Sequence, residues 1–123
     1  MTTTAASRRA LGAYGEDVAA RLLTGERGMV LLDRNWRCAE GELDLVLRDG
    51  DTLVACEVKT RRGTACGSPH EAVDTVRLER LHRLVWRWAE DHGLRPEQAR
   101  VDLVAVLRPR RGPAVVDHVV GLS

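Results

Sequence analysis

The chain has 123 residues with a net charge of +1, of which 44% are hydrophobic and 30% charged. These values predict one globular domain over residues 1–123 and exclude a disordered or fibrous protein. No apolar run approaches the roughly 20 residues that span a bilayer, so we expect no membrane partner. The three cysteines have no CxxC spacing and no secretory leader is visible, which together indicate a cytoplasmic protein.

Apolar periodicity and turn residues divide the chain into two helices and five strands. Residues 1–6 are small and polar, so we expect them to be disordered. The predicted helices are 7–23 and 70–92, and the predicted strands are 29–33, 42–48, 52–60, 100–107 and 114–120. The segments 34–41, 61–69 and 108–113 are predicted to be turns or loops. This order predicts an α/β fold with a central mixed sheet flanked by helices.

The dipeptide Asp49-Gly50 is a strong hairpin signal between two of these strands. If Arg48 pairs with Asp51, the numbers of paired residues sum to 99; a loop over 49–52 makes the sum 101 and sets Asp44 opposite Glu57. With either loop, alternation places four charged side chains on one face of the sheet, namely Glu42, Asp44, Glu57 and Lys59. Six apolar side chains then cover the other face: Leu43, Leu45, Leu47, Val54, Cys56 and Val58. An odd-length loop with a bulge would break this pattern.

Lys59 is the only lysine among nineteen basic residues. GC-rich coding explains the excess of arginine, but it leaves open why one position keeps a compact ammonium group. The three carboxylates on the same face repel one another and need a compensating charge. Lys59 supplies one, and a Mg²⁺ or Mn²⁺ ion would supply the rest, because both ions prefer carboxylate oxygens. The alternative is an exposed polar face with ordinary cross-strand ion pairs.

These residues resemble a known nuclease motif. Asp44, followed after twelve residues by Glu57-Val58-Lys59, resembles the bipartite motif of the PD-(D/E)xK nuclease superfamily, which includes many restriction enzymes and Holliday-junction resolvases. From about residue 11 to 106, the chain is also similar to the small bacterial YraN family. That similarity runs through residues 15–17, 34–37, 41–46, 57–61, 67–69, 72–73 and 101–102. Leu43 replaces the proline of the superfamily motif, and Arg77 stands where the family leads us to expect a lysine.

The resemblance implies a restriction-endonuclease-like core and Mg²⁺-dependent (or Mn²⁺-dependent) hydrolysis of DNA, with branched or otherwise structured DNA as one substrate class. By motif position, Asp44 and Glu57 match the metal ligands and the Val58 carbonyl matches a third. Lys59 matches the residue that orients or deprotonates the attacking water. Glu16 matches the first-helix acid that completes the metal site in the resolvase branch.

Other polar residues have competing interpretations. Glu42 suits either metal contact or an ion pair with Arg37 or Arg61. Asp102 is predicted to be a structural acid that lies at a strand edge or satisfies the hydrogen bonds of a loop. The histidines at 70, 82, 92 and 118 share no metal-ligand spacing and are predicted to be structural.

Arginines provide the candidate contacts to nucleic acid. Three lie together beside the apolar stripe of the second helix, and further pairs lie in segments predicted to be loops. The candidates are Arg80, Arg83 and Arg87, with Arg61-Arg62 and Arg110-Arg111. Trp86 lies opposite the apolar stripe, where it would stack on a base or a partner unless a neighbouring loop covers it.

Two further functional classes remain open. One is a non-catalytic module that binds nucleic acid or docks a partner on the same fold. The small size of the chain favours this class, or else requires an oligomer such as a homodimer to read the substrate. The other is an α+β scaffold whose acids are only surface charge.

Overall fold

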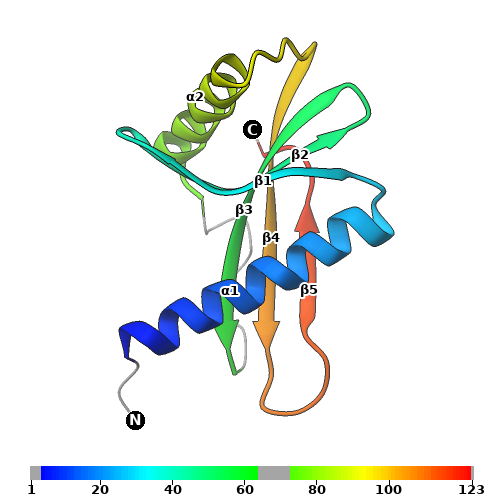
Figure 1. The fold of residues 1–123 in the computed structure, drawn as a ribbon. Helices are drawn as coiled ribbons and strands as arrows, with labels where there is room; N and C mark the ends of the chain where they lie inside the picture. Colours follow the sequence, from blue (N-terminus) through cyan, green and yellow to red (C-terminus); the bar gives the residue numbers. More distant parts are fainter. Residues whose placement is uncertain (1–3, 64–72, 123) are drawn as a thin grey trace.

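A mixed five-stranded sheet, in the order β1-β2-β3-β4-β5, lies between two helices (Figure 1). The computed structural model describes residues 4–63 and 73–122. Its elements are α1 (Ala5–Arg21), a π-helical turn η1 (Leu22–Glu26), β1 (Val30–Cys38), β2 (Gly41–Asp49), β3 (Thr52–Arg62), α2 (Thr75–Asp91), β4 (Gln98–Arg108) and β5 (Val115–Val119). Strands β3 and β4 are parallel, and all other neighbours are antiparallel. The predicted α/β class is confirmed, and the arrangement is consistent with a restriction-endonuclease-like core.

Each face of the sheet has its own helix and its own apolar cluster. The end of α1 and η1 cover one face, where Leu45, Leu47, Val54 and Cys56 are buried and Val58 packs against them. Helix α2 covers the other face, where Val46, Leu53 and Ala55 are buried. None of the helices in the described residues is long and apolar enough to cross a membrane.

The hairpin joining β2 and β3 follows the second of the two predicted registers. Asp49 pairs with Thr52, so the loop contains only Gly50 and Asp51, and Gly50 has the positive φ of 60° that such a turn requires. The ladder continues to the pair Leu45 and Cys56, whose numbers sum to 101. The next residues along the two strands are Asp44 and Glu57, which therefore lie opposite each other.

One residue of the predicted apolar face lies on the other side. Leu43 packs in the α2 cluster and not with Leu45, so the prediction for Leu43 is wrong. Between the β1 partners of these two leucines lies Asn35, which has a φ of 53°. A left-handed residue twists its strand locally, and the two paired strands turn over together at this point. Strict alternation therefore fails between Leu43 and Leu45.

Several element boundaries also differ from the predictions. Strand β1 continues to Cys38, because the polar residues of 34–37 belong to an edge strand and not to a turn. Helix α1 begins at Ala5, since the Thr4 hydroxyl caps it by accepting a hydrogen bond from the Ser7 amide at 3.0 Å. Helix α2 begins at Thr75 with Asp74 as its cap. Strand β3 extends to Arg62, and predicted segments within 64–72 lie outside the described residues.

Helix α1 approaches β3 closely at one glycine. Gly15 is buried, and a Cβ atom built there would collide with the Thr60 side chain. Thr60 is β-branched and has little freedom to move aside. Glycine at this position therefore sets the distance between α1 and β3, and with it the position of the neighbouring Glu16.

We predict opposite effects for alanine at the two glycines of this helix. Gly15→Ala should lower the free energy of unfolding by about 2 kcal/mol, because it forces overpacking against Thr60. Gly12→Ala should raise it by about 0.5–1 kcal/mol, because Gly12 has open space around it and alanine favours a helix. Urea denaturation of both variants measures the difference. Equal effects would contradict the assigned helix packing.

Candidate active site

Asp44 of β2 and Glu57 of β3 form the centre of the candidate site. One Asp44 oxygen, Oδ2, accepts a hydrogen bond from the Val58 amide at 2.9 Å. Glu57 is only 5% exposed, and its Oε1 accepts a hydrogen bond from Arg77 Nη2 at 2.8 Å. Lys59 Nζ lies 3.8 Å from the same oxygen. The predicted convergence of Asp44, Glu57 and Lys59 on one face is confirmed, while their catalytic roles remain predictions.

The Asp44 carboxyl opens into a cleft between the sheet and α2. The cleft has a volume of about 250 Å³, and it is lined by Gly41, Glu42, Asp44, Arg77, Arg80, Leu81 and Leu84. Two leucines form its apolar wall, and charged groups form the rest. A small anionic ligand entering here would meet two arginines and two carboxylates together.

Burial raises the pKa of Asp44 from 3.8 to about 7. The nearby Glu57 charge adds to this effect, as does the charge of Glu16, whereas the hydrogen bond from the Val58 amide opposes it. Asp44 and Glu57 also share a side-chain hydrogen bond. Near neutral pH, Asp44 therefore exchanges its proton readily, and the two carboxyls behave as one interacting pair.

The cations around this pair are unevenly placed. Arg77 and Lys59 both contact Glu57, and within residues 4–63 and 73–122 no cation lies at ion-pair distance from Asp44. The hydrogen bond to Glu57 raises the pKa of the Arg77 guanidinium, which stays charged. Arg77 Nε is buried and has no hydrogen-bond partner among the side chains and backbone groups that the structure describes. The uncompensated negative charge thus belongs to Asp44.

Arg77 was not among the site residues that sequence reasoning selected. It was noted only as a departure from the lysine expected in the family. Its contact with Glu57 depends on how α2 is positioned over β3, which no local pattern encodes. The one feature of the sequence that indicates a contact with the sheet is that Arg77 lies one helical turn before Leu81, on the buried side of α2.

Glu16 lies near the pair but is held by an arginine. Its side chain is 16% exposed, and its Oε1 lies 3.5 Å from Arg34 Nη2. Its charge nevertheless contributes to the raised pKa of Asp44. The structure therefore brings Glu16 into electrostatic contact with Asp44, and its role in completing a metal site remains a prediction.

Glu42 takes the structural alternative. Its Oε2 lies 3.4 Å from Arg37 Nη2 on the neighbouring strand, where the two residues face each other. Glu42 also lines the cleft beside Asp44. Of the two predicted arginine partners, Arg37 is the one observed.

Among the described residues, no group of three or more His, Cys, Asp or Glu side chains is arranged to hold a metal ion. The candidate site instead offers two carboxylates, Asp44 and Glu57. One or two carboxylates, with water completing the shell, are a usual arrangement for Mg²⁺.

The three α2 arginines predicted to contact nucleic acid have different surroundings. Arg80 lines the cleft, and Arg87 Nη1 lies 2.8 Å from Glu40 Oε1 at the β1–β2 turn. Arg83 is exposed. Trp86 is 45% exposed, and the loop containing Leu94 lies beside it without covering it.

Asp102 is structural, as predicted. It is fully buried, and it accepts hydrogen bonds from Arg100 Nε at 2.8 Å and the Gly121 amide at 3.0 Å. His118 Nε2 lies 2.9 Å from its other oxygen. His92 also has a structural position, since its ring stacks on Trp88. His70 lies outside the described residues.

Comparison with known proteins identifies the family. The model of the family described as "Uncharacterised protein family UPF0102" matches residues 15–106. A UPF0102 protein of Nocardioides sp. is 59% identical over the whole of both chains. One from Kineococcus radiotolerans is 55% identical over 95% of this chain and 96% of its own, and one from Streptomyces griseus is 54% identical over 95% and 98%. The chain belongs to this family, which confirms the YraN part of the resemblance.

We predict that neutralising Asp44 stabilises the protein at high pH. The raised pKa means that wild-type stability falls as pH rises from about 4 to about 7, because the folded state must release a proton that it binds more tightly than the unfolded state. Asp44→Asn keeps an acceptor for the Val58 amide and removes this cost. Urea denaturation in EDTA should show a gain of about 2 kcal/mol at pH 8 and little at pH 4.

Asp117→Asn is the matched control, because Asp117 is exposed on β5 and carries the same charge. It should change stability little at either pH. An Asp44→Asn variant less stable than wild type at pH 8 would contradict the assigned burial.

Proposed function

We propose that this member of UPF0102 is a divalent-cation-dependent nuclease that hydrolyses phosphodiester bonds in DNA. The observation that carries the proposal is the convergence of Asp44 and Glu57 beside the only lysine, at a cleft that Asp44 lines together with two arginines. Carboxylates, an ammonium group and guanidinium groups are the set needed to handle a phosphodiester and an attacking water. The PD-(D/E)xK resemblance supports the same assignment.

The donor atoms suit Mg²⁺ or Mn²⁺. Asp44 has no cation at ion-pair distance among the described side chains, and its pKa is raised by burial and by the nearby charge of Glu57. Asp44, Glu57 and the Val58 carbonyl would hold the ion, with Glu16 nearby as a further acid. The bound ion would lower the pKa of a water molecule and neutralise charge on the phosphate.

The chain's own cations have separate roles in this proposal. Lys59 is about one-third exposed, so its ammonium can turn from Glu57 toward the attacking water or a phosphate oxygen. Arg77 and Arg80 line the cleft and would bind the non-bridging phosphate oxygens. Glu57 orients both Lys59 and Arg77 through the shared oxygen Oε1.

The substrate class follows from the small size of the chain. Nothing in the described residues forms a separate module for reading base sequence. A nuclease of this kind would recognise the backbone shape of DNA, and branched or flapped DNA presents such a shape. A homodimer would supply two clefts to one such substrate.

The contact of Arg77 with Glu57 favours a second candidate function. A guanidinium already neutralises the carboxylate that a metal ion would share. This arrangement also suits a domain that binds nucleic acid without cleaving it. Metal binding and cleavage separate the two functions.

We predict that the protein binds Mn²⁺ through both carboxylates. Isothermal calorimetry should show one site in the wild type and at least a tenfold loss of affinity in Asp44→Asn and Glu57→Gln. The same variants should lose cleavage of linear, flapped and four-way DNA by at least 100-fold. Asp117→Asn is the control and should retain both properties. Mn²⁺ binding without cleavage would favour the second candidate, and absence of both would reject the nuclease.

Replacing Arg77 should separate cation binding from catalysis. Arg77→Gln removes the positive charge from Glu57, so Mn²⁺ affinity should stay the same or increase. The cleavage rate should fall by at least tenfold, because one phosphate contact is lost. Calorimetry and single-turnover cleavage measure the two effects. A large loss of Mn²⁺ affinity would instead mean that Arg77 positions Glu57.

A further inference from the structure

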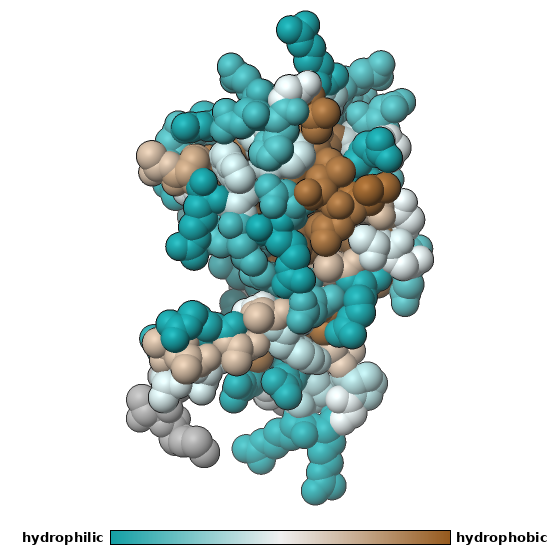
Figure 2. Space-filling view, viewed as in Figure 1, coloured by the Kyte–Doolittle hydropathy of each residue, from teal (hydrophilic) through white to brown (hydrophobic). Residues whose placement is uncertain are grey.

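Five arginines gather at one end of the molecule, away from α2. They come from the last residues of β3 and β4 and from the loop that joins β4 to β5, and we call them the arginine end: Arg61, Arg62, Arg108, Arg110 and Arg111. Figure 1 shows both parallel strands ending here, and Figure 2 shows hydrophilic side chains projecting from the same end. The sequence placed these residues in separate loops, and the parallel register brings them together.

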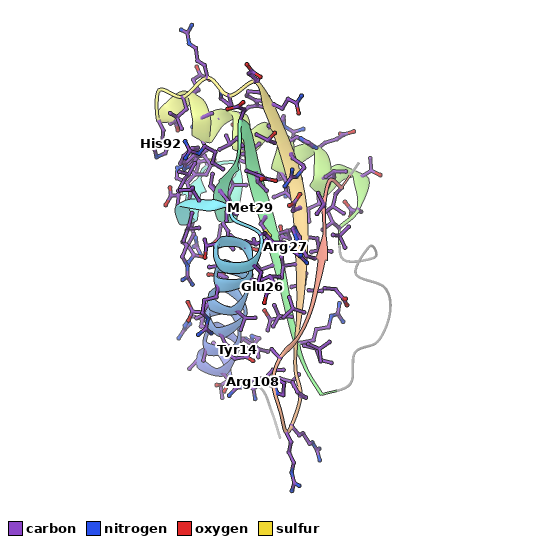
Figure 3. All side chains as sticks on the ribbon, turned by 90° about the vertical axis from the view of Figure 1, so that its right-hand side faces the viewer. Tyr14, Glu26, Arg27, Met29, His92 and Arg108 are labelled. Carbon is purple, nitrogen blue, oxygen red and sulfur yellow. The ribbon has the colours of Figure 1, made fainter. Side chains whose placement is uncertain are left out.

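The geometry of the arginine end is fixed by strand pairing. Arg62 pairs with Arg108 across the β3–β4 ladder, so two guanidinium groups start from adjacent backbone positions. Arg108 also stacks over the Tyr14 ring at 4.7 Å, which ties this end to α1 (Figure 3). The Gly63 amide donates to the Arg108 carbonyl at 3.2 Å and holds the two strand ends together.

No acid neutralises this cluster within residues 4–63 and 73–122. Five arginines elsewhere form ion pairs, namely Arg34, Arg37, Arg77, Arg87 and Arg100. Others, such as Arg27 and Arg95, form none in the described residues, but they stand singly on the surface and not in a cluster. The five arginines of the end form none. Like charges held together without a counter-ion are costly, so the arrangement favours an external anion.

The arginine end is also hollow. A cavity of about 600 Å³ is lined by Arg62, Gly63, Arg108, Pro109 and Arg110. Guanidinium groups bind phosphate oxygens in pairs, and several on one surface suit a chain of phosphates. The lining contains no large apolar side chain that would insert into a lipid layer, which favours nucleic acid over a membrane.

The arginine end lies along β3 from the cleft lined by Asp44, Arg77 and Arg80, which we call the carboxylate cleft. Arg61 shares a face of β3 with Glu57 and Lys59 because side chains alternate along the strand. The end of β3 at Arg62 lies five residues beyond Glu57, a separation of about 16 Å along the strand. Arg62 and its partner Arg108 point to the α1 face, so Arg61 and the loop arginines at the end of the sheet are the ones on the way to the cleft. Five base pairs of duplex DNA span about 17 Å, so one duplex arm that passes the end of the sheet can reach both places.

We propose that the arginine end binds the phosphate backbone of a DNA duplex arm about five base pairs from the phosphodiester held in the carboxylate cleft. This inference rests on the proposed function for its choice of DNA. It assigns a binding role to Arg108, Arg110 and Arg111, which contact no part of the cleft. It also sets a minimum arm length for the substrate.

The test compares two charge-matched double variants in EDTA, by fluorescence anisotropy with labelled 20-base-pair and four-way DNA. Arg110→Gln with Arg111→Gln should weaken binding at least tenfold and reduce the slope of log K against log[salt] by about 2. Arg27→Gln with Arg95→Gln changes the charge equally at exposed positions elsewhere and should change the affinity less than twofold. In wild type, arms shorter than five base pairs should lose the affinity that the arginine end supplies.

Each other outcome is decisive. Equal effects of the two double variants, or binding that is independent of arm length, would overturn the proposal. So would tighter binding to RNA of matched length, or to vesicles containing anionic lipid, than to DNA. Mn²⁺ calorimetry should be unchanged in both double variants. Arginine-dependent DNA binding without cleavage would reject the nuclease function and support the arginine end as a DNA-binding surface. Cleavage that does not depend on these arginines would support the nuclease function and reject the arginine end as a binding surface.

Discussion

The chemistry of this protein depends on two carboxyl groups that the backbone holds against each other. A two-residue loop sets Asp44 beside Glu57 at the end of the β2–β3 ladder, where α2 covers the buried Glu57 and the half-buried Asp44. Side chains in this relationship lie about 5 Å apart at Cβ, so neither can move away from the other without breaking the strand pairing. Repulsion and burial both oppose ionisation, which is why the pKa of Asp44 is so high.

The positive charges and hydrogen-bond donors around this pair of carboxyl groups are distributed unevenly. Both nearby cations contact Glu57, whereas Asp44 has the Val58 amide and the Glu57 carboxyl as hydrogen-bond partners. A backbone amide stabilises a carboxylate but cannot cancel its charge. If the site served stability alone, an arginine beside Asp44 or an apolar residue in its place would be the simpler solution. The proposed function assigns this unbalanced oxygen to an exchangeable divalent cation.

The sequence predicted the elements that depend on local patterns and missed those that depend on packing. Alternation and the Asp49-Gly50 turn were sufficient to place Asp44, Glu57 and Lys59 together. They left the register open between two values, because both loops satisfy the same alternation. Only the pairing of Asp49 with Thr52 settles it.

The failures have identifiable physical causes. The extent of β1 was missed because an edge strand carries polar residues on its solvent side, which resemble a turn in sequence. The side of Leu43 depends on a left-handed Asn35 in the neighbouring strand, and no period-2 pattern reports that. Arg77 and the arginine end depend on contacts between distant segments. Such contacts follow from the placement of α2 and from the parallel pairing of β3 with β4.

Two groups of arginines can be distinguished in this protein, those that form ion pairs between elements of the fold and those that gather at the arginine end. Where an arginine joins two elements, it has an acid partner, as Arg34 has in α1 and Arg100 has at the hairpin. Where arginines gather at the ends of β3 and β4, they have none in the described part of the chain. Arg61, Arg62 and Arg108 occupy neighbouring positions of the paired strands, and Arg110 and Arg111 follow in the β4–β5 loop. Their mutual repulsion is a cost that a bound anion would relieve, and in the proposed function the phosphate backbone of DNA is that anion.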